Sequence, residues 1–306
     1  MSTATERVRQ FGPVTSCRVD LPSGRVHVQG CEGERASVVV RVDADGSSDP
    51  DIDGLVAVTH EDGVLSIQPG TKPWGRGLLG LVAVGPHDHP TVDLLLPRDA
   101  KLVIRTVGGD MSVHGCGGGQ TMGTVTGEVV VAEATGRVEV RSVSGQVAVA
   151  GRSLDVDVSS TSGRVRIDDQ RAARVRVRSV SGDVELHGGV ATDGPSRVET
   201  LSGDVSVVAL EGVTLMPRTV SGRVAADEGA RREIRHGATA LVVGDGSAEL
   251  HVRSVSGNIR LARSPRAAGG DGRSGPGDPM LDALEALSRG EISVEEADRR
   301  LGSPHG

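Results

Sequence analysis

The densest group of potential metal ligands in the chain is His87-Asp88-His89. Two imidazoles and a carboxylate are ligand types that Zn²⁺ accepts, but a structural zinc site needs four ligands. No third and fourth ligand follow at a recognisable spacing, and the group comes directly after Pro86, a turn-forming residue. A solvated loop is therefore favoured over a metal site, and we expect no cofactor.

Carboxylates that could carry out acid–base chemistry are Asp168, Asp169, Asp183 and Asp204. Catalysis of this kind needs two carboxylates within several ångströms of each other in a perturbed environment. Asp183 and Asp204 occupy a repeat position that they share with Arg164, Arg223 and Asn258. We therefore expect solvated acids and no enzymatic activity. Gly115–Gly119 is glycine-rich, but it lacks the Gly-Lys-Ser/Thr ending of a phosphate-binding loop.

Six arginines lie close together in an otherwise acidic chain: Arg164, Arg166, Arg171, Arg174, Arg176 and Arg178. If they point outward, they form a basic patch for anionic lipid headgroups or an anionic polymer. The favoured alternative is pairing across neighbouring strands with nearby acids, which stabilises a sheet modestly. These acids are Asp155, Asp157, Asp168, Asp169 and Glu185.

A repeat of the form [ST]-V-S-G-x-V positions these residues. Its glycines are Gly109, Gly127, Gly145, Gly163, Gly182, Gly203, Gly222 and Gly257. Most intervals are 18 to 21 residues, and the last, of 35 residues, has room for one degenerate repeat. The columns two residues before, two after and four after the glycine are nearly all apolar. A hydroxyl residue always stands three before it.

The repeat predicts an all-β fold, a single extended β-solenoid with about 18–20 residues per coil. Apolar and polar residues alternate with a period of two, as in a strand with one buried face. Each repeat holds two short strands, and its glycine fits a tight corner. Val147, Val165, Val184 and Val205 should form an inward ladder.

The remaining chain divides by composition. Residues 12–95 read as irregular N-terminal β coils that cap the stack, interrupted by an apolar loop at 70–90, and residues 96–263 as the regular repeats. Residues 264–277 are rich in glycine and proline, as in flexible linkers. Residues 278–303 predict a short helical hairpin, with Asp278 as N-cap and Pro279 at the first helical position.

Two apolar segments are candidate interaction sites. The loop presents Trp74, Leu78, Leu79 and Leu81, which either cap the solenoid or bind a partner. The hairpin is too short to hold a core of its own. It presents Leu281, Leu284, Leu287 and Ile292. We expect it to dock on a protein partner or on a second copy of the chain.

Composition excludes several functional classes. One Trp, one Phe and no Tyr in 306 residues argue against a protein that stacks nucleic-acid bases on aromatics, and the net charge of −7 argues against general polyanion binding. No apolar run predicts a transmembrane helix, although peripheral membrane contact stays open. The first eleven residues do not resemble a secretory signal. Three cysteines are too few for a disulfide framework. We therefore expect free buried thiols and a cytoplasmic location.

The run Thr91-Val92-Asp93-Leu94-Leu95-Leu96-Pro97, followed by the Ser/Thr-Val-Ser-Gly repeats, resembles the bacterial "putative adhesin" or toastrack β-strand-repeat family. The resemblance covers roughly residues 12 to 262. Residues 284–297 are similar to the short helical, SHOCT-like module that accompanies such domains. The resemblance implies an association with bacterial envelope-stress responses, and the family brings no catalytic residues.

These observations predict a non-enzymatic β-solenoid that acts as an interaction scaffold. One alternative is a carbohydrate-binding or carbohydrate-active solenoid, although aromatic platforms for sugars are nearly absent. The other is a self-assembling polymer of solenoids, because an uncapped end coil exposes strand edges.

Overall fold

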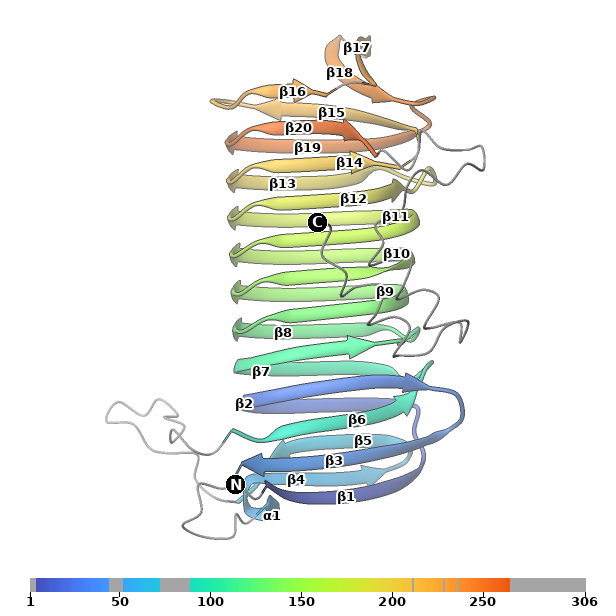
Figure 1. Ribbon diagram of the computed structural model, residues 1–306, viewed down its shortest axis with the longest axis vertical. Helices are drawn as coiled ribbons and strands as arrows, with labels where there is room; N and C mark the ends of the chain where they lie inside the picture. Colours follow the sequence, from blue (N-terminus) through green and yellow to red (C-terminus); the bar gives the residue numbers. More distant parts are fainter. Residues whose placement is uncertain are drawn as a thin grey trace, which may run out of the picture. The chain divides into compact units, whose positions relative to one another are not determined.

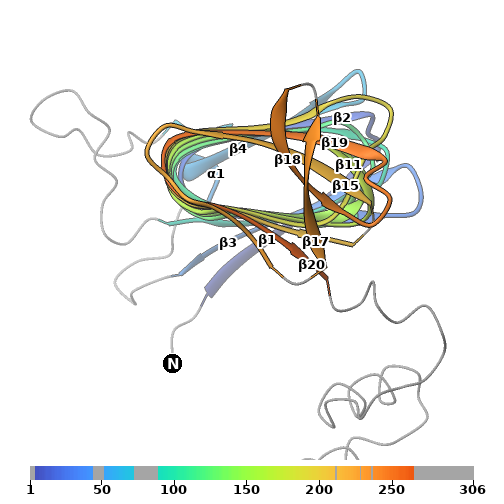
Figure 2. The same cartoon turned by 90° about the horizontal axis from the view of Figure 1, so that it is seen from above.

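The computed structural model describes residues 4–43, 52–71, 89–210, 212–227, 229–235 and 237–264. Within them, twenty strands join through backbone hydrogen bonds into one sheet, which winds into a stack of flattened coils (Figures 1 and 2). This confirms the predicted all-β solenoid. The one helix of the described residues, α1, is the single turn Ile52–Leu55. The predicted helical hairpin lies outside the described residues.

Three strands in the middle of the stack each form one complete coil. They are β9 (Val129–Ser144), β10 (Val147–Ser162) and β11 (Val165–Ser181). Neighbouring coils pair in parallel, so that Val147 lies opposite Val165 and Val158 opposite Val177. The two short strands predicted for each repeat are both present. The register shifts between Gly151 and Asp155, where the chain bends from one flat side of the coil to the other. We call each flat side of the stack a sheet, although backbone hydrogen bonds join all the strands.

Other coils are divided between separate strands. On one side of the middle coils lie β7 (Lys101–His114) and β8 (Gln120–Thr126). On the other side lie β12 (Val184–Val190), β13 (Ser196–Ser202) and β14 (Val205–Ala209). β12 continues one sheet by pairing with β11, and β13 continues the opposite sheet. The longer turn between β12 and β13 accounts for the 21-residue interval from Gly182 to Gly203.

Valine, leucine and isoleucine fill the interior of the stack. Val147, Val165, Val184 and Val205 are each at most 1% exposed, as the predicted inward ladder requires. β-branched side chains pack well on a pleated surface and have few rotamers to lose. Because each coil closes around its own apolar side chains, one continuous cluster of mostly aliphatic side chains extends through the stack, with the partly buried Phe11 packed against it.

The C-terminal end of the stack departs from chain order. β13 pairs with β19 (Ala248–Ser256), and β14 pairs with β20 (Ile259–Arg263). The earlier strands β15 (Val213–Thr219) and β16 (Val224–Ala226) pair with the other edges of β19 and β20 and form the outermost coil. The coil of Gly257 therefore lies between the coils of Gly203 and Gly222.

A degenerate repeat between Gly222 and Gly257 is not present, and that expectation is wrong. These residues instead form an antiparallel hairpin, β17 (Ala230–Arg235) and β18 (Ala238–Val243). β18 also pairs antiparallel with β15. The hairpin occupies the end of the stack and carries charged side chains, a common protection of an exposed strand edge.

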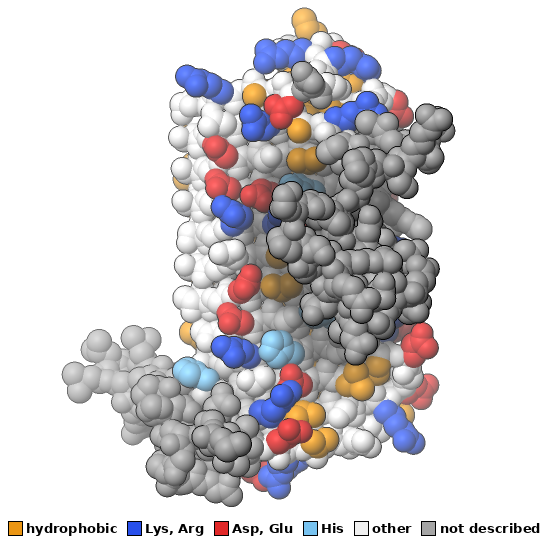
Figure 3. Space-filling model, viewed as in Figure 1, with side chains coloured by type: hydrophobic (Ala, Val, Ile, Leu, Met, Phe, Trp, Pro, Cys, Tyr) orange, Lys and Arg blue, Asp and Glu red, His pale blue; other side chains and the backbone are white. Residues whose placement is uncertain are grey.

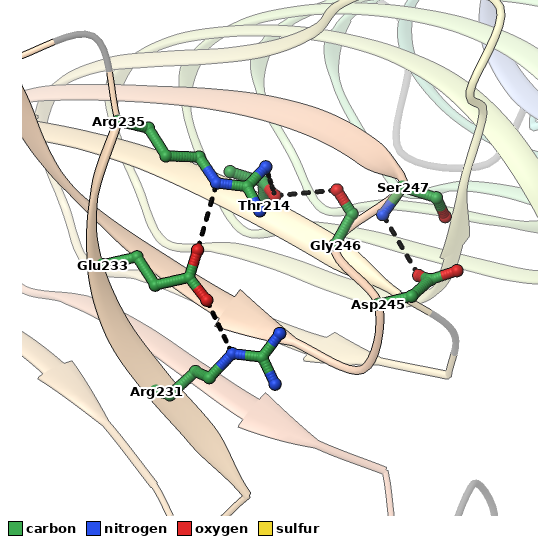
Figure 4. A network of polar contacts seen from close by, with 7 residues as sticks. All are labelled: Thr214, Arg231, Glu233, Arg235, Asp245, Gly246 and Ser247. Atoms are coloured by element: carbon green, nitrogen blue, oxygen red, sulfur yellow. Dashed lines mark hydrogen bonds and ion pairs between the residues drawn. The ribbon is translucent and has the colours of Figure 1, made fainter.

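A polar network holds this hairpin to the outermost coil (Figure 4). Arg235 donates from Nη1 to Oγ1 of Thr214 at 3.0 Å, and the Thr214 hydroxyl donates to the carbonyl of Gly246 at 2.8 Å. Glu233 accepts hydrogen bonds from Arg231 at 2.7 Å and from Arg235 at 3.2 Å. The network links β15, β17 and the turn after β18.

The N-terminal end is also out of chain order. The first complete coil, β2 (Ser16–Cys31), lies between β7 and a later coil. That later coil consists of β5 (Val64–Pro69) and β6 (Thr91–Pro97). The predicted strands of residues 12–95 are therefore present, and most of the predicted loop between them lies outside the described residues.

Antiparallel strands cap this end as well. β3 (Arg35–Asp43) pairs with β6, and β1 (Ala4–Pro13) pairs with β3. β4 (Val56–Glu61) pairs with β5. Both ends of the stack thus finish in antiparallel strands, as capping of a repeat array requires.

Candidate binding surfaces

At the glycine corners, the backbones of neighbouring coils leave no room for a Cβ atom. A Cβ atom built on Gly145 would lie 2.0 Å from the carbonyl oxygen of Gly127, and one on Gly163 would lie 2.1 Å from that of Gly145. Gly127 and Gly163 also have positive φ, at 131° and 120°. The prediction of a tight corner is confirmed, and the close backbone contact adds a second reason for glycine.

The acids next to these corners bind backbone groups. The Oδ1 atom of Asp204 accepts the N–H of Asn258 at 2.7 Å, and the Oδ1 atom of Asn258 accepts the N–H of Arg223 at 3.1 Å. Asp183 accepts the N–H of Asp204 in the same way at 3.0 Å. These contacts join one coil to the next and explain why aspartate and asparagine recur in this column.

Asp168 and Asp169 do not converge on one site. Asp169 is 2% exposed, and its two oxygens accept the N–H groups of Ser153 at 3.1 Å and Leu154 at 2.8 Å. Asp168 is on the outer surface, where it accepts a hydrogen bond from Arg166 at 2.8 Å. One carboxylate therefore holds a turn and the other pairs with a surface cation.

Of the His87-Asp88-His89 group, the structure describes His89 alone. Its side chain is exposed, with Nδ1 3.3 Å from the Ser23 hydroxyl. Across the described part of the chain, no three His, Cys, Asp or Glu side chains gather in a way that could hold a metal ion. The absence of a metal stays a prediction for the whole chain.

The three cysteines are free thiols. Cys17 and Cys31 lie at opposite ends of the same strand, β2, and Cys116 follows β7. Cys17 and Cys116 are buried, while Cys31 is partly exposed. Burial raises the pKa of the Cys17 thiol to about 12 and that of Cys116 to about 11.

A row of exposed apolar side chains runs beside the glycine corners. Its members stand two residues before a corner glycine, and each is between 42% and 81% exposed. We call this row the valine ridge: Val107, Val125, Val143, Val180, Leu201, Val255 and Val220. Coils stack about 4.8 Å apart, so these side chains form a strip interrupted only by Thr161. A contiguous exposed apolar strip marks an interaction surface, whereas scattered apolar residues do not.

The sequence does contain a signal for this ridge, but the composition of the column is not enough to find it. The ridge column is apolar, like the two columns whose side chains point inward. It is the inward orientation of the residue before it that shows that the ridge residue points outward. Ser142 is buried at 5% exposure, so Val143 must point outward, and it is 46% exposed. The recurring hydroxyl occupies the inward position and the valine the outward one, the reverse of their usual preference.

The six arginines singled out in the sequence divide between the two sheets. Arg164 and Arg166 lie on the sheet of β12, where both are within 4 Å of Glu185. Arg174, Arg176 and Arg178 lie on the opposite sheet, beside β13. Acidic and basic side chains are interspersed on the face shown in Figure 3. The side chain of Arg171 is outside the described set.

The predicted apolar contact residues are not tested by the structure. The loop residues Trp74, Leu78, Leu79 and Leu81 lie outside the described residues. The same holds for the hairpin residues Leu281, Leu284, Leu287 and Ile292. Both proposed contact segments stay predictions.

Within the described residues, no helix has the length and apolarity needed to cross a bilayer.

Solved structures with low sequence identity are similar to this chain. A putative adhesin from Parabacteroides distasonis ATCC 8503 is 14% identical, with 85% of this chain and 97% of that chain covered and a TM-score of 0.45. A putative cell adhesion protein from Clostridium sporogenes ATCC 15579 is 12% identical, with coverages of 86% and 100% and a TM-score of 0.29.

No curated protein matches the chain. The sequence match to a family is extensive, because it runs from residue 19 to residue 268 and includes every corner glycine of the repeat. The family is described as Toastrack DUF4097, and this chain belongs to it.

Proposed function

We propose that this protein is a non-enzymatic interaction scaffold whose valine ridge binds a protein partner. The carrying observation is the row of exposed apolar side chains along one edge of the solenoid. Backbone contacts between stacked glycines fix the positions of these side chains. Valine has a single side-chain torsion, which is already strongly restricted in the free protein. Binding would therefore cost little side-chain conformational entropy.

The chemistry of the acids supports a role in binding over catalysis. Asp183 and Asp204 hold backbone N–H groups of the next coil, and Asp169 holds two N–H groups of a turn. Each is engaged in maintaining the fold. A catalytic pair would need carboxylates that face the same reacting atom.

The two alternative functions have less support. Sugar-binding surfaces commonly use aromatic side chains, and Phe11 is the one aromatic residue in the described ranges. End-to-end polymerisation needs open strand edges with which a second copy can pair. The terminal strands β1 and β17 each carry several charged side chains, which disfavour such pairing. Participation in an envelope-stress response, a cytoplasmic location and docking through the predicted 278–303 hairpin belong to the proposal as predictions.

Site-specific photo-crosslinking tests the ridge directly. A photoreactive phenylalanine analogue placed at Val143 should form a discrete crosslinked product with another protein when cells are irradiated. The same analogue at Val130, which is on the same strand and half-buried on the other sheet, is the matched control. No product at Val143, or identical products at both positions, would contradict the proposal.

Deletion of residues 278–306 tests the hairpin separately. If it is the docking module, its removal should change the oligomeric state, measured by mass in solution, the Trp74 fluorescence or the recovery of the crosslinked partner. If all three are unchanged, the hairpin has no docking role. Subcellular fractionation of the producing cells tests the cytoplasmic location.

A further inference from the structure

Five arginines from three neighbouring strands gather on the sheet that contains β13. We call them the arginine cluster: Arg174, Arg176, Arg178, Arg197 and Arg253. β11 contributes the first three at alternate positions, so all three side chains face outward. The register places Arg176 opposite Arg197, and places Glu199 between Arg178 and Arg253. The cluster therefore extends across three consecutive coils.

One carboxylate is shared by three of these guanidinium groups. The oxygens of Glu199 lie 3.8 Å from Nε of Arg178, 3.9 Å from Nε of Arg197 and 3.9 Å from Nη1 of Arg253. These distances are longer than the 2.7–3.2 Å of a typical N–H···O hydrogen bond. Each guanidinium has five N–H donors. Glu199 therefore offsets part of the charge and leaves most donors available to a ligand.

The five arginines outnumber the four carboxylates beside them. Besides Glu199, these are Asp193, 2.8 Å from Arg174, Asp155, 3.5 Å from Arg176, and Asp157, which lies opposite Arg176 in the register of the preceding coil. Asp155 is itself shared with Arg137 on the preceding coil, at 3.7 Å. The chain as a whole has a net charge of −7, so the cluster is a local exception to the overall charge.

A hollow of about 360 Å³ lies over the cluster. Its lining includes Arg174, Arg176, Arg178 and Arg197, with Asp193 and Glu199 among the other groups. A second hollow of about 640 Å³ shares Arg178 and Glu199 with the first and continues to Arg218 and Arg253. The first volume is at the lower end of the range of small-molecule sites. The arginines thus line an open recess that can hold an anionic group.

We propose that this recess binds phosphate groups, either of a soluble oligophosphate or of a phospholipid headgroup. Guanidinium groups match phosphate oxygens in bidentate geometry and stay charged at all physiological pH values. Three guanidiniums that converge on one carboxylate suit a group with three or more acceptor oxygens better than one with two. A phosphate bound beside Glu199 would accept hydrogen bonds from the guanidinium N–H groups that do not point at this carboxylate.

The proposal does not depend on the valine ridge binding a protein. Its test is isothermal titration of the full chain with sodium tripolyphosphate at low ionic strength, together with sedimentation with phosphatidylglycerol or phosphatidylcholine vesicles. Tripolyphosphate should bind with an affinity that falls as salt is added, because the site is solvent-accessible. Replacing Arg176 and Arg197 together by glutamine should weaken binding by about tenfold or more.

Two matched variants sharpen the test. Glu199→Gln removes the competing carboxylate and should tighten phosphate binding. Arg166→Gln, on the opposite sheet, should leave it unchanged, because Arg166 already donates to Asp168 at 2.8 Å. All three variants change exposed or partly exposed side chains, and unchanged thermal unfolding would show that each is folded.

The outcomes distinguish the sources of phosphate. Tripolyphosphate binding without vesicle binding supports a soluble ligand. Sedimentation with phosphatidylglycerol alone, lost in the double arginine variant, supports a headgroup. The proposal is overturned if the wild type binds neither probe at low salt, if Arg166→Gln weakens binding as much as the double variant, or if polyglutamate binds as tightly as tripolyphosphate.

Discussion

The carboxylate of Asp204 accepts the backbone N–H of Asn258 at 2.7 Å, although 54 residues separate the two in sequence. The same carboxylate accepts the side-chain amide of Asn258, at 3.2 and 3.3 Å. This pair joins the coil of Gly203 to the coil of Gly257 and bypasses the coil of Gly222. It is therefore a specific contact of the out-of-order C-terminal end.

Asp204→Ala should destabilise the protein by about 1–3 kcal/mol, because a backbone N–H loses a charged acceptor. Urea unfolding measures the change in the free energy of unfolding. Asp157→Ala is the control, since Asp157 is a partly exposed aspartate of β10, on the opposite sheet, for which the described structure shows no hydrogen bond. Equal losses in the two variants would contradict a specific role for the Asp204–Asn258 contact.

Gly145→Ala should destabilise the protein by about 3 kcal/mol or more, since a Cβ atom there would lie 2.0 Å from a backbone oxygen that cannot move alone. Gly119→Ala provides the comparison, because a Cβ atom at Gly119 meets no atom within 4 Å. That variant should lie within about 1 kcal/mol of the wild type or be slightly more stable. Calorimetric melting of both variants checks the prediction, and a tolerated Gly145→Ala would refute the close-contact argument.

Val165→Asp and Val143→Asp should differ sharply, although both replace a valine of the repeat. Val165 is 0% exposed, and a carboxylate there would be buried without a partner, at a cost of about 4 kcal/mol or more. Val143 is 46% exposed, and its replacement should change stability by no more than about 1 kcal/mol. Circular dichroism of the two variants should show loss of strand signal for Val165→Asp alone.

The two buried thiols should be inert near neutral pH. With pKa values of about 12 and 11, Cys17 and Cys116 stay protonated in the folded protein at pH 8, and the thiolate is the reactive form. Ellman's reagent should therefore label them only after unfolding. Rapid labelling of all three cysteines in the folded protein at pH 8 would show that these two thiols are accessible.

The same thiols should make stability fall at alkaline pH. Their folded-state pKa values are above the ordinary value of 9.0, so the unfolded chain ionises first and stability is lost as pH rises from 9 towards 12. The background is small, because the chain has no tyrosine and its only lysines are Lys72 and Lys101. Urea unfolding at pH 8 and pH 10.5 should show a loss of about 4 kcal/mol, roughly half of which should disappear in Cys17→Ala.

The fold was largely predictable because the same residue pattern recurs in each repeat. Glycine spacing, period-two alternation and the inward valines at 147, 165, 184 and 205 all follow from local rules that each coil obeys in the same way. The stacking order at the two ends was not predictable, because the repeat specifies which residues can pair but not which coil is the neighbour. Gly257 fits equally well above Gly222 or above Gly203 by sequence alone.

The candidate surfaces were only partly predictable for a similar reason. The arginines of β11 were visible as a cluster in the sequence. Their neighbours Arg197 in β13 and Arg253 in β19 follow Arg178 by 19 and 75 residues, so the sequence alone did not bring them together. The division of Arg164 and Arg166 from the others depends on the bend in the middle of the coil. To predict the valine ridge, one must know whether each column of the repeat points inward or outward. The buried hydroxyl residues show this, because they take the inward position next to the ridge.

The out-of-order ends have a consequence for biosynthesis. As the chain leaves the ribosome, the coil of Gly222 emerges before the coil of Gly257, on which it rests in the finished stack. β15 therefore lacks its parallel neighbour β19, and β16 lacks its neighbour β20, until residues 248–263 have been made. The middle coils can assemble in the order of translation, whereas the C-terminal end must wait for its last strand. A ribosome stalled before residue 248 should therefore hold a nascent chain in which β15 and β16 lack these partners and are open to proteases.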